Sequence, residues 1–531
     1  MGLSARSASA NDKDRITMDN LQKQRKEMLN RKRRVILNND GCDVLYFPSD
    51  KQITPDNLLA LRTKALAGTQ VDTLFYCTIS AGFGCFTHNT KEGIVLDWDV
   101  PGQFGKDAVN ATGPLIKQGK DSLQIMVDFC RANHMEIFWS MRMNDTHDGA
   151  HRPDAPYPLF SPIKTQHPEY TLGAYDNRPK YGRWSGVDYS RPEIRDYAYR
   201  FIEEVCRNYD VDGIEMDFFR HLNYFKSVAN GGMATREELA AMTDLVRRVR
   251  KMTEREGLRR GRPILVAVRV PDSVAYCKAS GLDIERWLSE GLVDMLSATC
   301  YFRLNPWQDL VKLGHRYGVK VYPCLSESRV KGEVAPFRRM SQESYRARAT
   351  QVWQSGADGV YLFNFFNPNA PMLREIGDPK TLARLDKTYF ATVRTTFAAP
   401  NAWLAGGEKY INIPILSPQD PLIVRQGHAE KIELLVGDDL DAVSKAGTNP
   451  EATCHILTSD EQRVCLSLNG VELKERSAKG EWLDFPIPDK LLRRGNNQLE
   501  LTCEANDGVG DEKTSGHQTT VRDLALTVRL R

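Results

Sequence analysis

The feature that most constrains the fold of this chain is the alternation of short apolar runs with amphipathic segments from residue 35 to about residue 395. Eight runs rich in β-branched and aromatic residues are separated by helical patterns. The runs are 35–39, 73–80, 136–143, 213–218, 264–270, 295–301, 320–325 and 359–365. Eight strands, each followed by a helix, in fewer than about 400 residues predict an α/β fold of the (β/α)₈ barrel (TIM barrel) type.

Two helical patterns are clearest. The first, 191–209, has Ser190-Arg191-Pro192 at its start. The second, 235–256, starts with a threonine that precedes Arg-Glu-Glu and an apolar stripe. Proline in the first turn and threonine at the N-cap are typical helix starts. A doubly wound open sheet is the alternative, but it would normally carry a glycine-rich phosphate turn after its first strand, and none follows 35–39.

The pattern changes after about residue 400. Short strand-like runs separated by Gly, Pro, Asn and Asp replace the helical patterns, at 431–436, 464–468, 498–502 and 524–530. Such spacing is typical of an all-β sandwich. We therefore predict a polar N-terminal extension (1–34), a (β/α)₈ catalytic barrel (35–398) and a C-terminal β-sandwich accessory domain (399–531).

Composition excludes several classes of protein. The net charge of +3 argues against binding nucleic acid through bulk charge, and no run of about 18 apolar residues predicts a membrane span. We interpret the basic cluster at 31–34 as part of a solvated surface helix rather than a nucleic-acid patch. The eleven cysteines show no CxxC spacing and predict buried, reduced thiols. No apolar stretch resembles a signal peptide, so a cytoplasmic protein is expected, or a periplasmic or secreted one if a leader has been removed.

The fourth run, 213–218, contains two carboxylates. Glu215 and Asp217 alternate with an apolar set, and in a barrel strand alternate side chains face the helices and the interior. Both carboxylates therefore face inward, which is costly unless charge partners or catalysis account for them. Asp217 lies nearer the C-terminal mouth, where barrel enzymes build their sites, and we predict it to be catalytic. Glu215, one layer deeper, is either a second catalytic carboxylate or part of a buried salt-bridge network.

The same alternation places polar side chains on the two neighbouring strands. It turns Arg142 and Asn144 inward on the third strand and Arg269 inward on the fifth. Because these strands flank the fourth, the two guanidinium groups should bracket the carboxylates. Flanking positive charge favours ionised Asp217, which suits a nucleophile or a stabiliser of an oxocarbenium ion.

These motifs resemble the family-10-like glycosyl hydrolase group of bacterial barrel proteins. The resemblance rests on YDVDGIEMDFFR at 209–220 and WSMRMND at 139–145, and it extends over about two thirds of the chain. It implies a carbohydrate-active barrel whose catalytic residue is Asp217. The stretch 492–501 also resembles a signature of accessory sandwiches in glycoside hydrolases.

Two departures from better-known barrels narrow the chemistry. Chitinase-like barrels carry Asp-Gly-x-Asp-x-Asp-x-Glu on this strand, and Phe219 occupies the position of their catalytic glutamate. Family-10 xylanases carry an Asn-Glu pair after the fourth strand, which is also missing here. Neither the chitinase-like reaction nor the family-10 xylanase reaction is therefore expected.

Hydrolysis of a glycosidic bond normally needs a second carboxyl group as proton donor. Glu327 follows the seventh strand at the correct end of the barrel and is the first candidate, although strict alternation leaves its direction ambiguous. Asp272, Asp40 and Asp145, which follow the fifth, first and third strands, are the alternatives.

Further polar and aromatic residues follow the strands. The predicted substrate-binding residues are Arg142, Asn144, Arg220, His221, Arg269, Tyr301 and Trp184. Arginines at one rim, Arg303 and Arg329 included, are able to bind an anion such as a uronate or sulfate ester. Loop aromatics are able to stack on sugar rings, although they also pack simply to close loops.

A metal site is not predicted, and no cofactor is expected. His147 and His151 lie near Asp145 and Asp148, but the stretch is rich in turn formers and lacks an HExxH helix. The predicted partner is a carbohydrate, without nucleic acid or membrane, and nothing here predicts an oligomeric state.

Three functions remain open. The first is a glycoside hydrolase acting on a poly- or oligosaccharide, with a neutral or an anionic substrate. The second is a non-catalytic carbohydrate-binding barrel. The third is a lyase in which Arg142 and Arg269 neutralise a uronate while a Tyr or His removes a proton.

Overall fold

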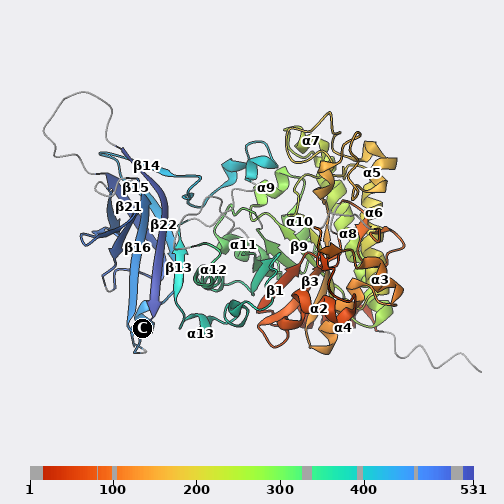
Figure 1. The fold of residues 1–531 in the computed structure, drawn as a ribbon, viewed down its shortest axis with the longest axis horizontal. Coiled ribbons are helices and arrows are strands. Elements are labelled where there is room, and N and C mark those ends of the chain that lie inside the picture. Colours follow the sequence, from red (N-terminus) through yellow and green to blue (C-terminus); the bar gives the residue numbers. More distant parts are fainter. Residues whose placement is uncertain are drawn as a thin grey trace, which may run out of the picture.

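A computed structural model of the chain describes residues 16–79, 82–98, 105–299, 301–325, 338–391, 399–445, 447–459, 464–488, 490–503 and 518–530. Figure 1 shows a body of strands surrounded by helices, with antiparallel sheets, coloured blue, at one end of the molecule.

The central sheet is parallel and has eight strands, in the order β11-β10-β9-β8-β7-β3-β1-β12. The strands are β1 (Val35–Asn39), β3 (Val71–Cys77), β7 (Glu136–Arg142), β8 (Gly213–Asp217), β9 (Leu265–Val270), β10 (Met295–Ala298), β11 (Lys320–Pro323) and β12 (Val360–Phe363). Each overlaps one of the eight predicted runs. The Leu325 N–H donates to the Tyr361 carbonyl at 3.0 Å and the Asp358 N–H to the Val321 carbonyl at 3.0 Å, so β11 and β12 adjoin. The prediction of a (β/α)₈ barrel is confirmed.

Helices cover the outside of this sheet and connect its strands. They are α1 (Met18–Leu29), α2 (Pro55–Arg62), α3 (Thr112–Lys117), α4 (Ser122–Ala132), α5 (Pro162–Gln166), α6 (Pro192–Asn208), α7 (Lys226–Ala229), α8 (Arg236–Arg260), α9 (Val274–Ala279), α10 (Ile284–Ser289), α11 (Trp307–Arg316), α12 (Gln342–Gln354) and α13 (Pro379–Leu382). Both predicted helices are present, as α6 and α8. Thr235 is the N-cap of α8, as the sequence predicted, and it forms a reciprocal capping box with Glu238.

Short elements occupy the loops of the barrel. They are β2 (Phe47–Pro48), β4 (Cys85–Phe86), β5 (Ile94–Val95), β6 (Ala108–Val109) and the 3₁₀ helices η1 (Lys64–Leu66), η2 (His147–Ala150), η3 (Pro168–Tyr170) and η4 (Pro371–Arg374). The helix η2 and these four strands lie in the segments that follow β1, β3 and β7.

An arginine closes the N-terminal end of the barrel. Arg33 is 0% exposed and donates to Glu136, the first residue of β7, at 2.6 and 2.9 Å. Thr73 donates to the same carboxylate at 3.2 Å, and Arg34 pairs with Asp72 at 2.7 Å. The prediction that the cluster at 31–34 is solvated is therefore wrong for Arg33, because the end of the barrel needs a charge partner for Glu136. The predicted surface helix is present as α1.

The C-terminal region consists of antiparallel sheets. Its elements are η5 (Pro400–Ala402), η6 (Gly407–Tyr410), β14 (Leu422–Arg425), β15 (Glu430–Val436), α14 (Leu440–Lys445), β16 (Pro450–Thr458), β17 (Val464–Leu468), β18 (Val471–Glu472), β19 (Ser477–Lys479), β20 (Trp482–Pro486), β21 (Gly495–Cys503) and β22 (Gln518–Leu530). One sheet contains β13 (Lys387–Phe390), β22, β16, β20, β19 and β14, and the other β15, β21, β17 and β18. The predicted all-β region is confirmed, and β13 adds to it a strand from residues that precede 399.

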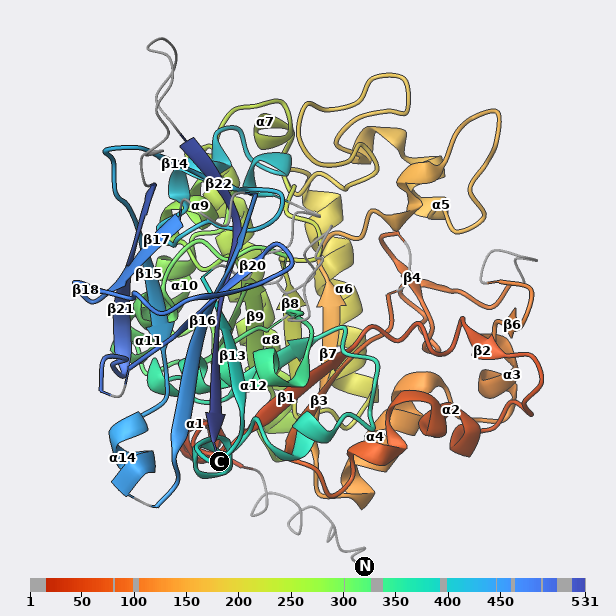
Figure 2. The same cartoon turned by 60° about the vertical axis from the view of Figure 1, so that its left-hand side comes forward.

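The antiparallel region packs against the barrel beside α12 (Figures 1 and 2). Arg339 pairs with Asp523 of β22 at 2.7 Å, and both side chains are buried. Gln351 of α12 donates to the Leu435 carbonyl of β15 at 2.6 Å. A cavity of about 830 Å³ lies along this junction, lined by residues that include Trp353 of α12, Pro379 of α13 and Val443 of α14. No described helix is both long and apolar enough to cross a membrane.

Candidate active site

Asp217 and Arg269 form a buried ion pair at the C-terminal ends of two neighbouring strands. The Arg269 Nη2 atom donates to Asp217 Oδ2 at 2.6 Å, and the side chains are 0% and 1% exposed. The Phe219 N–H donates to the other carboxylate oxygen, Oδ1, at 2.9 Å. The guanidinium also stacks over the Phe363 ring of β12, 3.7 Å from its centre. The inward direction expected for Asp217 and Arg269 is confirmed.

Glu215 lies one layer deeper and is held by two neutral hydroxyl groups. Ser140 of β7 donates to Glu215 Oε2 at 2.6 Å, and Tyr361 of β12 donates at 3.0 Å to Oε1. Since β8 and β12 are not adjacent in the sheet, the contact with Tyr361 crosses the interior of the barrel. Burial, followed by repulsion from Asp217, raises the pKa of Glu215 to about 7. Ser140 and Tyr361 were not among the predicted site residues.

Arg142 occupies the expected position but binds a different carboxylate. In the sheet register it lies beside Asp217, which in turn lies beside Arg269. Its Nη1 atom donates to Asp145 Oδ2 at 2.9 Å, and both side chains are buried. The two arginines therefore flank Asp217 in the strand order, while each guanidinium pairs with its own aspartate.

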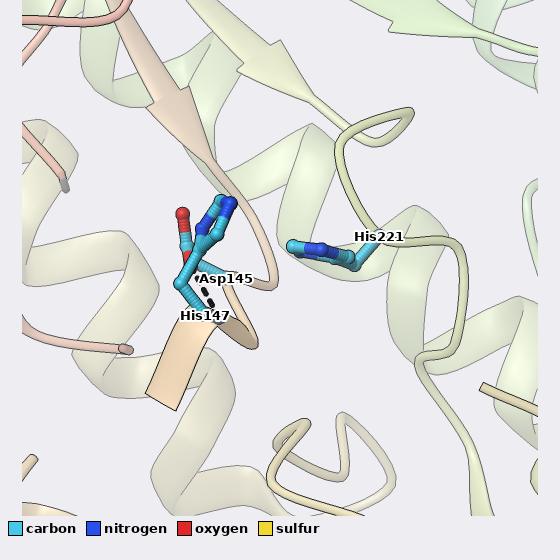
Figure 3. A group of neighbouring side chains, drawn as sticks. All are labelled: Asp145, His147 and His221. Carbon is cyan, nitrogen blue, oxygen red and sulfur yellow. Dashed lines mark hydrogen bonds and ion pairs between the residues drawn. The ribbon is translucent and has the colours of Figure 1, made fainter. Parts of the chain in front are cut away.

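Asp145 connects this row to two histidines (Figure 3). His147 Nδ1 lies 2.7 Å from Asp145 Oδ1. The His221 ring, from the segment after β8, contacts the His147 ring in an edge-to-face arrangement with centres 5.2 Å apart. The Thr146 N–H donates to His221 Nδ1 at 3.2 Å. Arg220 Nη2 donates to His147 Nε2 at 2.5 Å. Burial, followed by the charge of Arg220, lowers the pKa of His221 well below its usual value.

Within the described ranges, Asp145, His147 and His221 are the one group with the composition and spacing of a metal site. Neutral imidazoles are what a metal requires. Two guanidinium groups, those of Arg142 and Arg220, already bind the carboxylate and one imidazole, and both would repel a divalent cation at short range. The arrangement therefore favours a hydrogen-bonded network that presents polar groups to a substrate, and the absence of a metal stays a prediction.

Asp148 and His151, which the sequence places near Asp145 and His147, have other partners. Asp148 binds the buried Lys164 ammonium group at 2.7 Å. His151 stacks on Phe160 with ring centres 3.8 Å apart. The structure thus separates them from Asp145 and His147 and brings in His221, which lies too far along the chain for sequence spacing to indicate.

Two predicted substrate-binding residues organise loops. Asn144 is 0% exposed and donates to the carbonyls of Val187 and Asn223 at 3.1 and 2.6 Å, while it accepts from the Val187 N–H at 3.0 Å. Trp184 is 7% exposed and donates to the Gly149 carbonyl at 3.1 Å. Asn144 joins the segments that follow β7 and β8, and Trp184 joins two parts of the segment after β7, so packing accounts for their presence.

Arg220, His221 and Tyr301 lie together at the mouth. The Arg220 guanidinium lies 5.3 Å from the centre of the Tyr301 ring. Arg303, one of the rim arginines, stacks on Trp307 at 4.6 Å instead. Arg329, another of them, lies outside the described residues.

The alternative proton donors of the mouth are engaged in other interactions. Asp272 accepts from the backbone N–H groups of Leu304 and Asn305, each at 2.9 Å, and burial raises its pKa to about 6. Asp40 accepts from Arg62 at 2.8 Å. Asp145 is bound by Arg142 and His147, as above. Glu327, the first candidate, lies outside the described residues.

Comparisons with known proteins give distant similarities of structure. No family model matches the chain, and no curated protein matches it by sequence. Similar solved structures include α-L-fucosidase isoenzyme 2 from Paenibacillus thiaminolyticus, at 10% identity and a TM-score of 0.37, over 66% of this chain and 48% of that one. The PgaB (BpsB) glycoside hydrolase domain from Bordetella bronchiseptica has 11% identity and a TM-score of 0.42, over 66% of this chain and 98% of that one.

A GH36 α-galactosidase, AgaA from Geobacillus stearothermophilus, gives 10% identity and a TM-score of 0.37 over 90% of this chain and 56% of that one. This chain thus spans about half the length of the fucosidase and of the galactosidase. All three are glycosidases or glycosidase domains by name. Similarity at this level places the chain in none of their families, and the resemblance to the family-10-like group continues to rest on the sequence motifs.

Proposed function

We propose that this protein is a glycoside hydrolase in which Asp217 is the catalytic carboxylate. The observation that carries the proposal is the row Arg142, Asp217 and Arg269 at the C-terminal ends of β7, β8 and β9, above the inward-facing Glu215. The interior of a barrel is normally filled by apolar side chains, so a layer of charge at the end where barrel enzymes build their sites supports a catalytic role.

The chemistry of this row suits a developing positive charge. Arg269 and the Phe219 N–H hold the Asp217 carboxylate in one orientation, so that it needs no reorganisation during the reaction. A fixed carboxylate at this position stabilises an oxocarbenium-like transition state or attacks the anomeric carbon. Because the pKa of Glu215 is about 7, this group remains largely protonated below neutral pH and adds little negative charge beneath Asp217.

The proposed proton donor is Glu327. The proposal rests on its place in the sequence, four residues after the end of β11, because polar residues also follow the C-terminal ends of other strands. It is supported by the engagement of Asp40, Asp145 and Asp272 with arginine, histidine or backbone partners.

The proposed substrate is a poly- or oligosaccharide. An anionic group on it, such as a uronate or sulfate, would be bound by Arg220 beside His147 and Tyr301. Arg142 and Arg269 are less suited to this task because each already pairs with an aspartate. For the same reason the lyase alternative, which needs these two arginines to neutralise a uronate, is disfavoured.

The first experiment compares wild type with Asp217→Asn on neutral, uronic and sulfated glycans and measures released reducing ends. Asp272→Asn is the matched control. Asp272 is a buried aspartate just after the neighbouring strand β9, and its carboxylate accepts hydrogen bonds from backbone N–H groups. We expect Asp217→Asn to lose on the order of 10³-fold or more in activity and Asp272→Asn to retain it per folded molecule. Equal activity of Asp217→Asn and wild type would exclude Asp217 as the catalytic group.

A second experiment identifies the proton donor. Glu327→Gln should lose activity on natural glycosides but retain much of it on an aryl glycoside whose leaving group needs no proton, such as dinitrophenolate. Asp217→Asn should lose activity on both. A Glu327→Gln variant with unchanged activity on natural glycosides would remove Glu327 from the mechanism.

The second candidate function is a non-catalytic carbohydrate-binding barrel. One observation favours it: Asp217 is 1% exposed, and both of its oxygens already accept hydrogen bonds. In that case wild type and Asp217→Asn would bind a glycan of the panel with similar affinity, and neither would release reducing ends.

A further inference from the structure

Two exposed aromatic rings lie on one sector of the barrel mouth. Among the residues that the structure describes, Tyr46 and Phe366 are the only exposed tyrosine, phenylalanine or tryptophan side chains, at 49% and 39%. Tyr46 lies in the segment after β1 and Phe366 in the segment after β12. Because β1 and β12 are parallel neighbours, both segments leave the sheet at its C-terminal end. Neither residue was singled out by the sequence patterns.

An ion pair connects the two rings. The Arg62 guanidinium lies 4.1 Å from the centre of the Phe366 ring and donates to Asp40 at 2.8 Å. Backbone hydrogen bonds bring Tyr46 to the same pair, because the Tyr46 N–H donates to the Cys42 carbonyl at 2.8 Å and the Cys42 N–H donates to Asp40 Oδ1 at 3.0 Å. We call these four residues, Tyr46, Phe366, Arg62 and Asp40, the β1/β12 patch.

The patch is continuous with the charged row. Burial opposes the charge of Arg142, but acidic groups that include Asp145 and Asp40 raise its pKa overall. Leu45, next to Tyr46, lies in an apolar cluster against which Tyr157 packs, and Tyr157 belongs to the segment after β7 that also carries Asp145 and His147. The patch and Asp217 therefore belong to the same end of the barrel.

We propose that the β1/β12 patch binds a neutral pyranose unit of the glycan whose reacting unit lies over Asp217, an inference that rests on the proposed function. The flat apolar face of a pyranose covers an exposed ring and removes its apolar area from water. Around the rings, Asp40 accepts and Arg62 donates hydrogen bonds, which suits hydroxyl groups. The two charges cancel, so the patch favours a neutral sugar rather than a uronate.

The position of the patch predicts that it contributes to the binding of long substrates only. The strands β1 and β8 are separated by β3 and β7 in the sheet, so the patch and Asp217 lie on different sides of the mouth. One sugar unit cannot contact both, whereas an oligosaccharide that spans the mouth can. The patch is thus expected to raise affinity for chains of several units and to leave the smallest substrates unaffected.

The test is titration calorimetry of the full chain with neutral hexasaccharides (cellohexaose, xylohexaose, mannohexaose, maltohexaose and laminarihexaose), and with an alginate hexauronate as the anionic comparison. Tyr46→Ala and Phe366→Ala should each weaken the binding of the neutral hexasaccharide about five- to tenfold. Tyr46→Phe keeps the ring and should bind nearly as wild type, whereas Phe366→Leu keeps apolar area without a flat ring and should resemble the alanine variant. Val471→Ala, an exposed apolar position on β18, is the control for surface truncation.

The outcomes separate the patch from the catalytic proposal. Equal affinities of wild type and the alanine variants, or no binding of any neutral hexasaccharide by wild type, would overturn the inference. Stronger binding of the hexauronate than of every neutral hexasaccharide would overturn the assignment to a neutral unit. If the alanine variants lose affinity but wild type cleaves nothing, the patch stands and the hydrolase proposal fails.

Discussion

Arg269 of β9 donates a 2.6 Å hydrogen bond to Asp217 of β8, and the two side chains have almost no contact with solvent. A buried pair of this kind contributes little net stability, but removing one partner leaves the other charge uncompensated. The interaction of Arg269 with Asp217 can therefore be tested by the stability of variants, independently of their activity.

Arg269→Met should lower the free energy of unfolding by about 3–5 kcal/mol at pH 7.5, and adding Asp217→Asn should restore part of that loss. Urea denaturation of the two single variants and the double variant measures this coupling. Activity should be absent from all variants that lack Asp217, including the restabilised double variant. Strictly additive destabilisation would mean that the two side chains do not interact in solution.

Glu215 should make stability depend on pH. Its pKa is raised from the usual 4.5 to about 7, so between these values the folded state holds a proton that the unfolded chain has released. The free energy of unfolding should therefore fall as pH rises from about 4.5 to 7, by at most about 3 kcal/mol, and Glu215 should contribute no further change above that window.

Glu215→Gln lacks this titration, so the difference in stability between wild type and the variant should change across the same window. Tyr361→Phe removes a hydrogen bond that favours the ionised form, so its transition should move to higher pH. Denaturant titrations at half-unit pH steps measure the free energy of unfolding of wild type, Glu215→Gln and Tyr361→Phe. Parallel curves for wild type and Glu215→Gln would contradict the raised pKa.

Asp272 should stabilise a loop without taking part in the reaction. It accepts from the backbone N–H groups of Leu304 and Asn305, and Asp272→Ala would leave both donors buried without that partner. We expect a loss of about 2–4 kcal/mol for Asp272→Ala, less for Asp272→Asn, and an unchanged kcat per folded molecule. An Asp272→Asn variant that folds as wild type but has lost its activity would instead make Asp272 the proton donor.

The strands and the direction of their side chains could be predicted because a barrel strand has a strict period of two. That period turned Glu215, Asp217 and Arg269 inward, and it would have placed Ser140 and Tyr361 inward as well, had it been applied to uncharged residues. The interior of the barrel is thus largely readable from the sequence.

The partners formed by loops could not be predicted in this way. Asn144 and Arg142 follow the predicted direction, but their partners Val187 and Asp145 lie in the segment between β7 and α6, which has no regular period. The buried Arg33 was hidden for a related reason, since its partner Glu136 is remote in sequence and a basic cluster is usually solvated. Contacts set by the return of a loop require the structure.

The arginines at the mouth should decide whether Asp145, His147 and His221 bind a metal. Arg220 donates to His147 Nε2 and Arg142 to Asp145, so a divalent cation would have to displace hydrogen bonds and sit beside two positive charges. Wild type dialysed against EDTA should keep its thermal midpoint and activity, and its zinc content by mass spectrometry should be far below one per chain.

Arg220→Met releases the imidazole nitrogen of His147 and removes one charge, so this variant should bind Zn²⁺ more tightly than wild type in calorimetric titration. The matched change Arg303→Met, at a rim arginine that stacks on Trp307, should leave zinc affinity unchanged. Stoichiometric zinc in wild type that is lost in His221→Ala would show instead that the three side chains form a metal site and that the arginines move aside to admit it.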